Sequence, residues 1–191
     1  MNYTDINGWF TFEDVYDFVS NKLGENSNFL EIGVFEGKSI IYLAEKVKEK
    51  KKKINLFALD SFTGSENDES MKKHACNSVG GNLYLKFLNN LIKCNVANLV
   101  TPLIGRSEIV CSVFPDDFFD FIYIDAAHDY DSVKEDLTNW YPKLKINGII
   151  AGHDYVPNSL NNEVVMAVND FFREKKMKIT NWGISWLVTK L

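Results

Sequence analysis

The sequence has little of what stabilises a small secreted protein or builds a structural zinc site. Its three cysteines, Cys76, Cys94 and Cys111, are widely spaced and form no C-x-x-C pair. Cys76 lies close to His74, but no second pair of ligands follows at zinc-binding spacing. The cysteine pattern therefore excludes a disulfide framework and favours a reduced, cytoplasmic protein.

Long apolar runs and an excess of basic residues are also missing. No apolar run approaches the roughly 20 residues that span a bilayer, and the N-terminus, MNYTDINGWF, lacks the basic start and apolar core of a signal peptide. The formal net charge is −5, and the lysine-rich residues 45–53 are typical of a solvated helix end. We therefore expect neither a membrane nor a nucleic-acid partner, because phosphate backbones require a clustered basic surface.

What the sequence does contain is an alternation of short apolar segments and segments with helical periodicity. The expected strands are residues 28–34, 54–60, 99–105, 120–126 and 147–155. The expected helices are residues 10–23, 38–50, 83–95, 132–144 and 163–176, of which the first can start at Thr11 or Asp14. Because the strands are apolar on both faces, this alternation predicts an α/β fold with a doubly wound, mostly parallel sheet and helices on both faces.

The two ends of the chain complete this prediction. Residues 1–28 are expected to form an N-terminal helical cap, and residues 1–191 a single domain. Residues 179–191 contain two β segments with a short turn between them, which predicts an antiparallel C-terminal strand at or beside an edge of the sheet. This final strand could pair with a second copy of the chain, so a homodimer is one alternative.

Polar residues recur at the ends of the expected strands. An open parallel sheet binds ligands beyond the carboxyl ends of its strands, near the point where strand order reverses. The clusters that fall there are residues 31–37, Asp60, residues 105–108, residues 125–128, and His153 with Asp154. Their recurrence at consecutive strand ends predicts a single ligand site at that edge of the sheet.

The first of these clusters, in FLEIGVFEGKS, has two glycines four positions apart, Gly33 and Gly37. Glycine lets the backbone approach a ligand, and the helix that follows offers N–H groups to an anion. The spacing departs from the G-x-G-x-x-G of dinucleotide sites, and the bulky Phe35 and Glu36 stand between the glycines. A nicotinamide-dependent Rossmann oxidoreductase is therefore a disfavoured alternative.

The motif E-x-G-x-x-x-G-x-S after a strand resembles the first motif of class I S-adenosylmethionine-dependent methyltransferases, and LEIGVFEGKS is similar to that of the catechol-type O-methyltransferases. The later segments LFALDSF, GRSE and IYIDAAHDYDSVKEDL follow in the family's order, and the last is similar to a bacterial branch that methylates hydroxyls of small molecules or sugars. The resemblance runs from about residue 29 to the C-terminus. It implies a Rossmann-like fold, S-adenosylmethionine as cofactor and a small-molecule or sugar acceptor.

The resemblance also implies which residues bind the cofactor. Asp60, at the end of the second expected strand, corresponds to the acid that accepts hydrogen bonds from both ribose hydroxyls. The other implied contacts are Glu31, Gly33, Phe35, Gly37 and Ser39 at the methionine end, Ser61 and Phe62 on the adenine, Ser107 and Glu108 at the adenine edge, and Asp125 after the fourth strand. Glu31 would pair with the positive amino group of the cofactor or order the loop, and Ser39 would donate a hydrogen bond to the carboxylate of the cofactor.

The residues after the fourth and fifth strands would carry the chemistry. Asp125 corresponds to a metal-binding acid of the metal-dependent O-methyltransferases, and His128 stands where the catechol type has a lysine base. Histidine titrates near neutral pH, so His128 can take a proton from a hydroxyl. Asp125, His153 and Asp154 would hold a divalent ion, magnesium or manganese, or a later transition metal because of the histidine. Alternatively, His153 only orients Asp125 or the loop, with no ion.

Three further alternatives stay open from the sequence. Residues 61–82 form either a flap over the site or a surface excursion without a catalytic role. Trp9, Phe10 and Phe12 either close the mouth of the site or pack in the core. The chain is either an active O-methyltransferase or a binding module that keeps an S-adenosylmethionine or nucleotide pocket without its chemistry.

Overall fold

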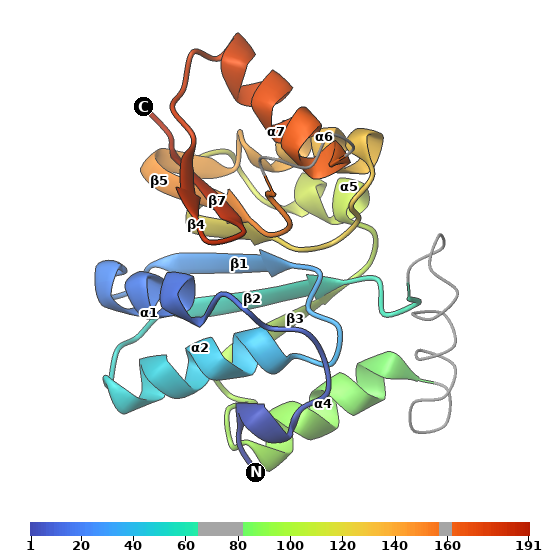
Figure 1. The fold of residues 1–191 in the computed structure, drawn as a ribbon. Helices are drawn as coiled ribbons and strands as arrows, with labels where there is room; N and C mark the ends of the chain where they lie inside the picture. Colours follow the sequence, from blue (N-terminus) through green and yellow to red (C-terminus); the bar gives the residue numbers. More distant parts are fainter. Residues whose placement is uncertain (65–81, 157–161) are drawn as a thin grey trace.

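The computed structural model describes residues 1–64, 82–156 and 162–191 of the chain. Most of the segment expected as a flap or surface excursion, residues 61–82, therefore lies outside the described residues. Within the described residues, one sheet of seven strands has the order β3-β2-β1-β4-β5-β7-β6 (Figure 1). The strands are β1 (Asn28–Ile32), β2 (Asn55–Asp60), β3 (Val100–Ile104), β4 (Phe119–Ile124), β5 (Leu144–Gly152), β6 (Thr180–Trp182) and β7 (Ser185–Thr189).

The sheet is mostly parallel, as the sequence predicts. Strands β3, β2, β1, β4 and β5 run parallel to one another, whereas β7 is antiparallel to β5 and β6 is antiparallel to β7. The predicted antiparallel C-terminal strand is therefore confirmed. This strand lies beside the edge, because the three-residue β6 pairs with β7 on the side away from β5 and forms the edge itself. Gly183, with φ +62°, lies in the turn between the two strands. Pairing with a second copy of the chain stays a prediction.

Helices cover both faces of the sheet, which confirms the expected layers. In Figure 1, α1, α2 and α4 lie on one face and α5, α6 and α7 on the other. The helices are α1 (Glu13–Lys22), α2 (Lys38–Glu49), α4 (Leu83–Lys93), α5 (Ser107–Val110), α6 (Tyr130–Trp140) and α7 (Glu163–Glu174), with the 3-10 turns η1 (Tyr3–Asp5) and η3 (Cys111–Val113).

Two hydrophobic cores separate the sheet from these helices. The central strand β4 has the sequence FDFIYI, and from Phe121 onward, past a register shift between Phe119 and Phe121, its residues alternate between the two cores. Phe121 and Tyr123 lie in one core, and Ile122 and Ile124 in the other. This alternation follows from the two-residue period of a strand. Burial on both faces explains why the parallel strands are apolar throughout.

The N-terminal helix starts later than the sequence indicates. Helix α1 begins at Glu13, and no side chain caps it. Thr11 does not act as the cap, because its hydroxyl bonds instead to a histidine ring after β5. Phe10 and Phe12 are buried in the core, whereas Trp9 is 73% exposed. Of the three aromatic residues before the helix, two are therefore core residues.

Two other predictions of local structure are wrong. The helix expected over residues 132–144 ends at Trp140, and Leu144 already belongs to β5. Pro142 comes after the C-cap Tyr141 and has no N–H to continue the helix. The segment GRSE contains the start of α5, which sequence reasoning treated as a loop, because a helix of four residues is too short to show a period.

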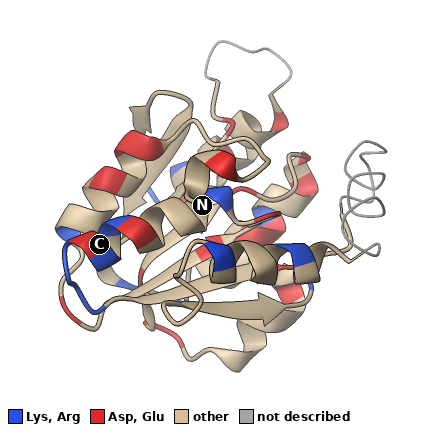
Figure 2. Cartoon of the chain, turned by 90° about the horizontal axis from the view of Figure 1, so that it is seen from below, with Lys and Arg blue, Asp and Glu red and all other residues tan. Residues whose placement is uncertain are grey.

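One charged side chain, that of Lys52, serves the end of a helix. Lys52 donates from Nζ to the carbonyls of Ser20, Asn21 and Leu23 at 2.8 to 2.9 Å, and so closes the C-terminal end of α1. Elsewhere, basic and acidic residues are interspersed over helices and loops (Figure 2).

Among the described residues, no helix combines the length and the apolar character needed to cross a membrane.

Candidate active site

The carboxyl ends of the parallel strands meet at one edge of the sheet. Strand order reverses between β1 and β4, because the chain passes from β1 outward to β2 and β3 and then returns to β4 on the other side. In open α/β sheets this switch point is where ligands bind. The loops after β1, β2, β4 and β5 therefore surround one candidate site.

The loop between β1 and α2 brings backbone to this switch point. Gly33 has φ +88°, and a side chain there would collide with the carbonyl oxygen of Asp125 after β4. Gly37, with φ +89°, is the N-cap of α2, and an added Cβ would lie 2.8 Å from the ring of Phe87. Phe35, between the glycines, also has a positive φ of 50°. The conformation and the close packing of this glycine loop, residues 33–37, both depend on glycine.

Glu31, the acid of the same motif, is buried beneath the glycine loop. Ser39 Oγ donates to its Oε1, so this hydroxyl is engaged with Glu31. Neither Glu31 Oε2 nor the nearby hydroxyl of Tyr16 has a hydrogen-bond partner among the described residues. Burial raises the pKa of Glu31 to about 8, although the hydrogen bond from Ser39 opposes the shift. Glu31 is therefore mostly protonated near pH 7.

Asp60 ends β2, on the other side of the glycine loop. Its Oδ2 accepts a hydrogen bond from the backbone N–H of Phe35, and its Oδ1 accepts one from that of Phe62, both at 2.8 Å. Burial raises the pKa of Asp60, and these backbone hydrogen bonds oppose the shift. The carboxylate thus ties the glycine loop to the loop after β2, at the position predicted to bind ribose.

The residues predicted to lie on the adenine have partners within the protein. Phe62 is 8% exposed, and its ring lies 5.1 Å from that of Tyr84 and 5.2 Å from that of Phe87, measured between centroids. Ser61 Oγ lies 2.9 Å from Thr63 Oγ1. The ring of Phe62 is therefore directed into the core below the loop.

Ser107 and Glu108, predicted at the adenine edge, lie at the start of α5. The Ser107 hydroxyl donates to Asp136 and accepts a hydrogen bond from the indole N–H of Trp140 at 2.6 Å. Burial raises the pKa of Asp136 to about 6, and the bond from Ser107 opposes this shift. Glu108 forms an ion pair with Arg106. Ser107 therefore fixes α5 to α6.

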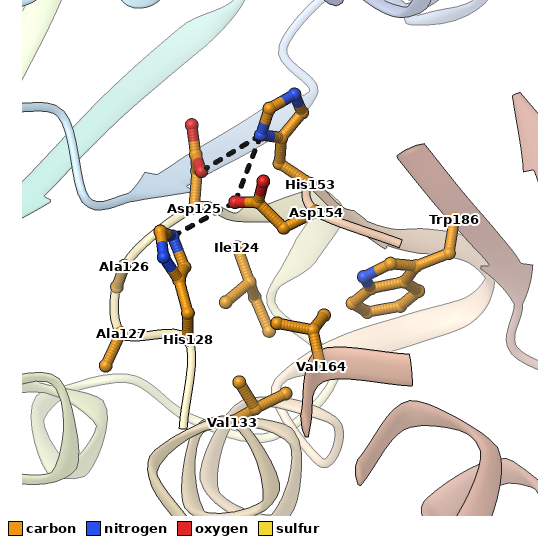
Figure 3. A pocket seen from close by; sticks show the side chains of 10 residues that line it. All are labelled: Ile124, Asp125, Ala126, Ala127, His128, Val133, His153, Asp154, Val164 and Trp186. Atoms are coloured by element: carbon orange, nitrogen blue, oxygen red, sulfur yellow. Dashed lines mark ion pairs between the residues drawn. The ribbon is translucent and has the colours of Figure 1, made fainter. Parts of the chain in front are cut away.

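Four ionisable side chains meet after β4 and β5 (Figure 3). His128 Nε2 lies 3.0 Å from Asp154 Oδ2. His153 Nδ1 lies 3.2 Å from the same oxygen and 3.6 Å from Asp125 Oδ1. The other nitrogen of His153, Nε2, lies 2.9 Å from Thr11 Oγ1. The structure therefore brings together all the residues predicted as base or as metal ligands.

Burial and mutual charge set the protonation of this acid–histidine cluster, Asp125, His128, His153 and Asp154. Burial raises the pKa of Asp125 to about 6, while His153 opposes the shift. Hydrogen bonds from His128 and His153 hold the pKa of Asp154 well below its ordinary value. The bond to Asp154 raises the pKa of His128 against the effect of burial. Burial lowers the pKa of His153, but Asp154 and Asp125 outweigh it and raise the pKa overall.

Part of this cluster has the arrangement of a metal-binding group. Asp125, His128 and Asp154 offer ligand atoms that all lie within 4.8 Å of one another. This group differs from the predicted set in its histidine, because His128 takes the place of His153. Two carboxylates and an imidazole suit a transition metal better than magnesium, which prefers oxygen ligands.

A pocket opens beside the acid–histidine cluster (Figure 3). Its lining residues are Ile124, Asp125, Ala126, Ala127, His128, Val133, His153, Asp154, Val164 and Trp186. The indole N–H of Trp186 is buried there and has no hydrogen-bond partner among the described residues. Gly152 leaves room for this ring, since an added Cβ would lie 2.7 Å from it. The accessible space is about 10 Å³, room for about one water molecule, so the pocket by itself does not hold a small-molecule acceptor.

Sequence reasoning missed several residues at this site. Trp186 lines the pocket from β7, and Thr11 reaches it from the N-terminal segment. Glu36, inside the glycine loop, is 1% exposed and forms a 2.6 Å ion pair with Lys86. An acid between two glycines was a visible signal for Glu36. Thr11 and Trp186 had none, because their positions depend on contacts between distant parts of the chain.

Comparison with known proteins agrees with this geometry. Residues 30–155, well over half of the chain, match the model of a methyltransferase domain. The chain therefore belongs to the methyltransferase-domain family and is a class I S-adenosylmethionine-dependent methyltransferase domain.

Solved structures share the fold at low sequence identity. The O-methyltransferase NovP has a TM-score of 0.69 and 19% identity, over 93% of this chain and 77% of that one. A proposed methyltransferase from Streptococcus mutans, in complex with SAH, has a TM-score of 0.64 and 13% identity, over 97% of this chain and 100% of that one. An uncharacterised protein of Acanthamoeba polyphaga mimivirus is 25% identical over 145 residues, 76% of this chain. The chain spans 59% of that relative's length.

Proposed function

We propose that this chain transfers a methyl group from S-adenosylmethionine to a hydroxyl of a small molecule or sugar. The observation that carries the proposal is the group of Asp125, His128 and Asp154 at the switch point, because it sets proton acceptors beside the glycine loop. Similarity to the O-methyltransferase NovP supports a hydroxyl acceptor. The interspersed charges of Figure 2 support a small acceptor over nucleic acid, which requires a clustered basic surface.

The residues around the glycine loop fit S-adenosylmethionine. Gly33 and Gly37 let the loop pack tightly against Asp125 and Phe87, and this conformation would bring its backbone to the methionine end of the cofactor. Asp60 lies at the end of β2, where the ribose would bind, and Glu31 Oε2 has no partner among the described residues, so it would accept from the amino group once Glu31 has lost its proton. The cofactor supplies a methyl group on a cationic sulfur. The role of the protein is to align the hydroxyl with that methyl group, to exclude water and to remove the hydroxyl proton.

Proton removal is assigned to His128. Its Nε2 faces Asp154, so Nδ1 is the nitrogen left to take the hydroxyl proton. The Asp154 carboxylate stabilises the imidazolium that forms, and it raises the pKa of His128, which makes the ring a stronger base. The side chain of His128 is 62% exposed, so an acceptor can reach it.

A divalent ion offers a second route at the same cluster, where Asp125, His128 and Asp154 would hold it. A bound ion lowers the pKa of a hydroxyl and so aids loss of its proton. His128 would then be a ligand and could not also be the base. The two routes therefore differ in how activity responds to a chelator.

Calorimetric titration and product formation test the proposal. We expect the chain to bind S-adenosylmethionine and S-adenosylhomocysteine, and to form the latter only when phenols, catechols or sugars are added. No binding of either compound would refute the cofactor, and product formed with amines but not hydroxyls would refute the acceptor class. Activity that persists in EDTA assigns proton removal to His128, whereas activity that requires added manganese or another divalent ion assigns it to the ion.

Asp60→Asn tests the predicted ribose contact. The variant keeps the shape of the side chain but loses the charge that strengthens hydrogen bonds to hydroxyls. Its amide also replaces one oxygen that accepts a backbone N–H, from Phe35 or Phe62. We expect the dissociation constant for S-adenosylmethionine to rise about tenfold or more. Asp14→Asn, at an exposed position on α1, is the matched control. Equal affinity of the two variants would contradict the placement of the cofactor.

A further inference from the structure

The N-terminal segment touches the candidate site at two points before α1 begins. At the glycine-loop side, Lys38 Nζ donates to the carbonyl of Gly8 at 3.2 Å. Further along, Thr11 Oγ1 lies 2.9 Å from Nε2 of His153, a residue 142 positions away in the sequence. The two contacts fix the course of residues 8–11 across the edge of the sheet, and they bring the Thr11 hydroxyl to the acid–histidine cluster.

The ring of His153 is held from three directions. Nδ1 faces Asp154 Oδ2 at 3.2 Å and Asp125 Oδ1 at 3.6 Å, and Nε2 faces Thr11. The ring of Phe12 lies 5.1 Å from the imidazole, between centroids, so the residue after Thr11 also packs against it. The His153 side chain is only 12% exposed. Thr11 and Phe12 thus contact one side of the His153 ring, and the carboxylates of Asp125 and Asp154 lie on its other side.

The chemistry of these partners decides which nitrogen of His153 carries the proton. An ionised carboxylate only accepts hydrogen bonds, so Nδ1 must be the donor toward Asp154. In the neutral ring Nε2 is then an acceptor, and among these neighbours the Thr11 hydroxyl is the group that can donate to it. A nitrogen that carries a proton toward a carboxylate cannot ligate a cation through the same lone pair.

We propose that Thr11 is a positioning residue, which holds the His153 ring so that Nδ1–H donates to Asp154 and is withheld from a metal ion or an acceptor. This inference rests on the proposed function, because it concerns the same cluster. It assigns the two histidines different tasks. His153 orients Asp154 and Asp125, and His128 is the imidazole that acts on the acceptor or the ion.

Nuclear magnetic resonance of the ring nitrogens tests this in the chain without ligands. Thr11→Val removes the hydroxyl at nearly constant volume, Thr11→Ala removes it with less bulk, and Thr11→Ser keeps it. We expect the wild type and Thr11→Ser to give the same His153 signals, with Nδ1 protonated and Nε2 hydrogen-bonded. In Thr11→Val and Thr11→Ala, the Nε2 signal should move toward that of an unbonded nitrogen. A spectrum of His153→Ala identifies the signals.

Turnover gives a second readout. We expect Thr11→Val to lower kcat by about 3- to 10-fold, as loss of one hydrogen bond does, with an unchanged dissociation constant for S-adenosylmethionine and full rescue in Thr11→Ser. Wild-type His153 signals in both Thr11→Val and Thr11→Ala would overturn the proposal. If the signals change as expected but the wild-type chain methylates no hydroxyl, the role of Thr11 in holding the ring stands and the proposed function fails.

Discussion

Glu31→Gln is the substitution whose effect the structure defines most sharply. Glu31 is fully buried, and burial raises its pKa to about 8, against 4.5 for an ordinary glutamate. Glutamine keeps the shape of the side chain and an oxygen for the Ser39 hydroxyl, but it cannot ionise. The substitution therefore removes one ionisable group and changes the shape of the side chain little. Its effect on stability must depend on pH.

The sign follows from proton binding. Between pH 4.5 and about 8, the folded chain keeps a proton on Glu31 that the unfolded chain releases. Stability therefore falls as pH rises through this range, because higher pH favours the state with fewer bound protons. The contribution of the protonated Glu31 is complete below pH 4.5 and is lost by about pH 8. At about 1.4 kcal/mol per pH unit, the difference between 4.5 and 8 amounts to about 5 kcal/mol.

Urea unfolding of the two proteins between about pH 5 and about pH 8 measures this difference. We expect Glu31→Gln to match the wild type near the lower pH and to be more stable by several kcal/mol near the upper one. Burial also raises the pKa values of Asp125 and Asp136, but these groups titrate in both proteins and cancel in the difference. A difference that stays constant across the range would refute the reasoning.

Two further substitutions test the loop and the base. Gly33→Ala should lower the free energy of unfolding by about 3 kcal/mol or more, because of its φ of +88° and its collision with the Asp125 carbonyl oxygen. Gly24→Ala, where an added Cβ meets nothing within 4 Å, is its control in the same urea assay, and equal losses would contradict the argument. His128→Ala should lower turnover in EDTA by about 100-fold or more at unchanged S-adenosylmethionine affinity, since general bases contribute roughly that much. Undiminished turnover would remove His128 from the mechanism.

Much of the fold could be predicted from the sequence, because its signals are local. Strands such as β4 are apolar on both faces, and only a sheet covered on both sides buries them. The order of the last two strands is not local in this sense. A short turn predicts a hairpin, but it does not decide which of β6 and β7 pairs with β5. The core contacts of Trp186 and Leu187 favour β7, and those contacts come from elements far away in the sequence.

The candidate site was also predictable only in part. Parallel strands share a direction, so the residues after β4 and β5 had to meet, and Asp125, His128 and Asp154 do meet. The partners of individual polar atoms could not be predicted. Ser39 was expected to reach a cofactor and bonds to Glu31, and Thr11 was expected to cap a helix and bonds to His153. Each of these bonds joins side chains that the sequence alone gives no reason to pair.

Asp60 is predicted to bind the ribose of the cofactor, and in the structure it also forms hydrogen bonds within the protein. Each of its oxygens accepts one backbone N–H, from Phe35 or from Phe62. A carboxylate has about four lone-pair sites, so these two bonds alone do not saturate it. The backbone bonds also fix the rotation of the carboxyl group before any ligand arrives. If Asp60 binds ribose as predicted, the bonds that hold the glycine loop would also hold its oxygens in place for the hydroxyls.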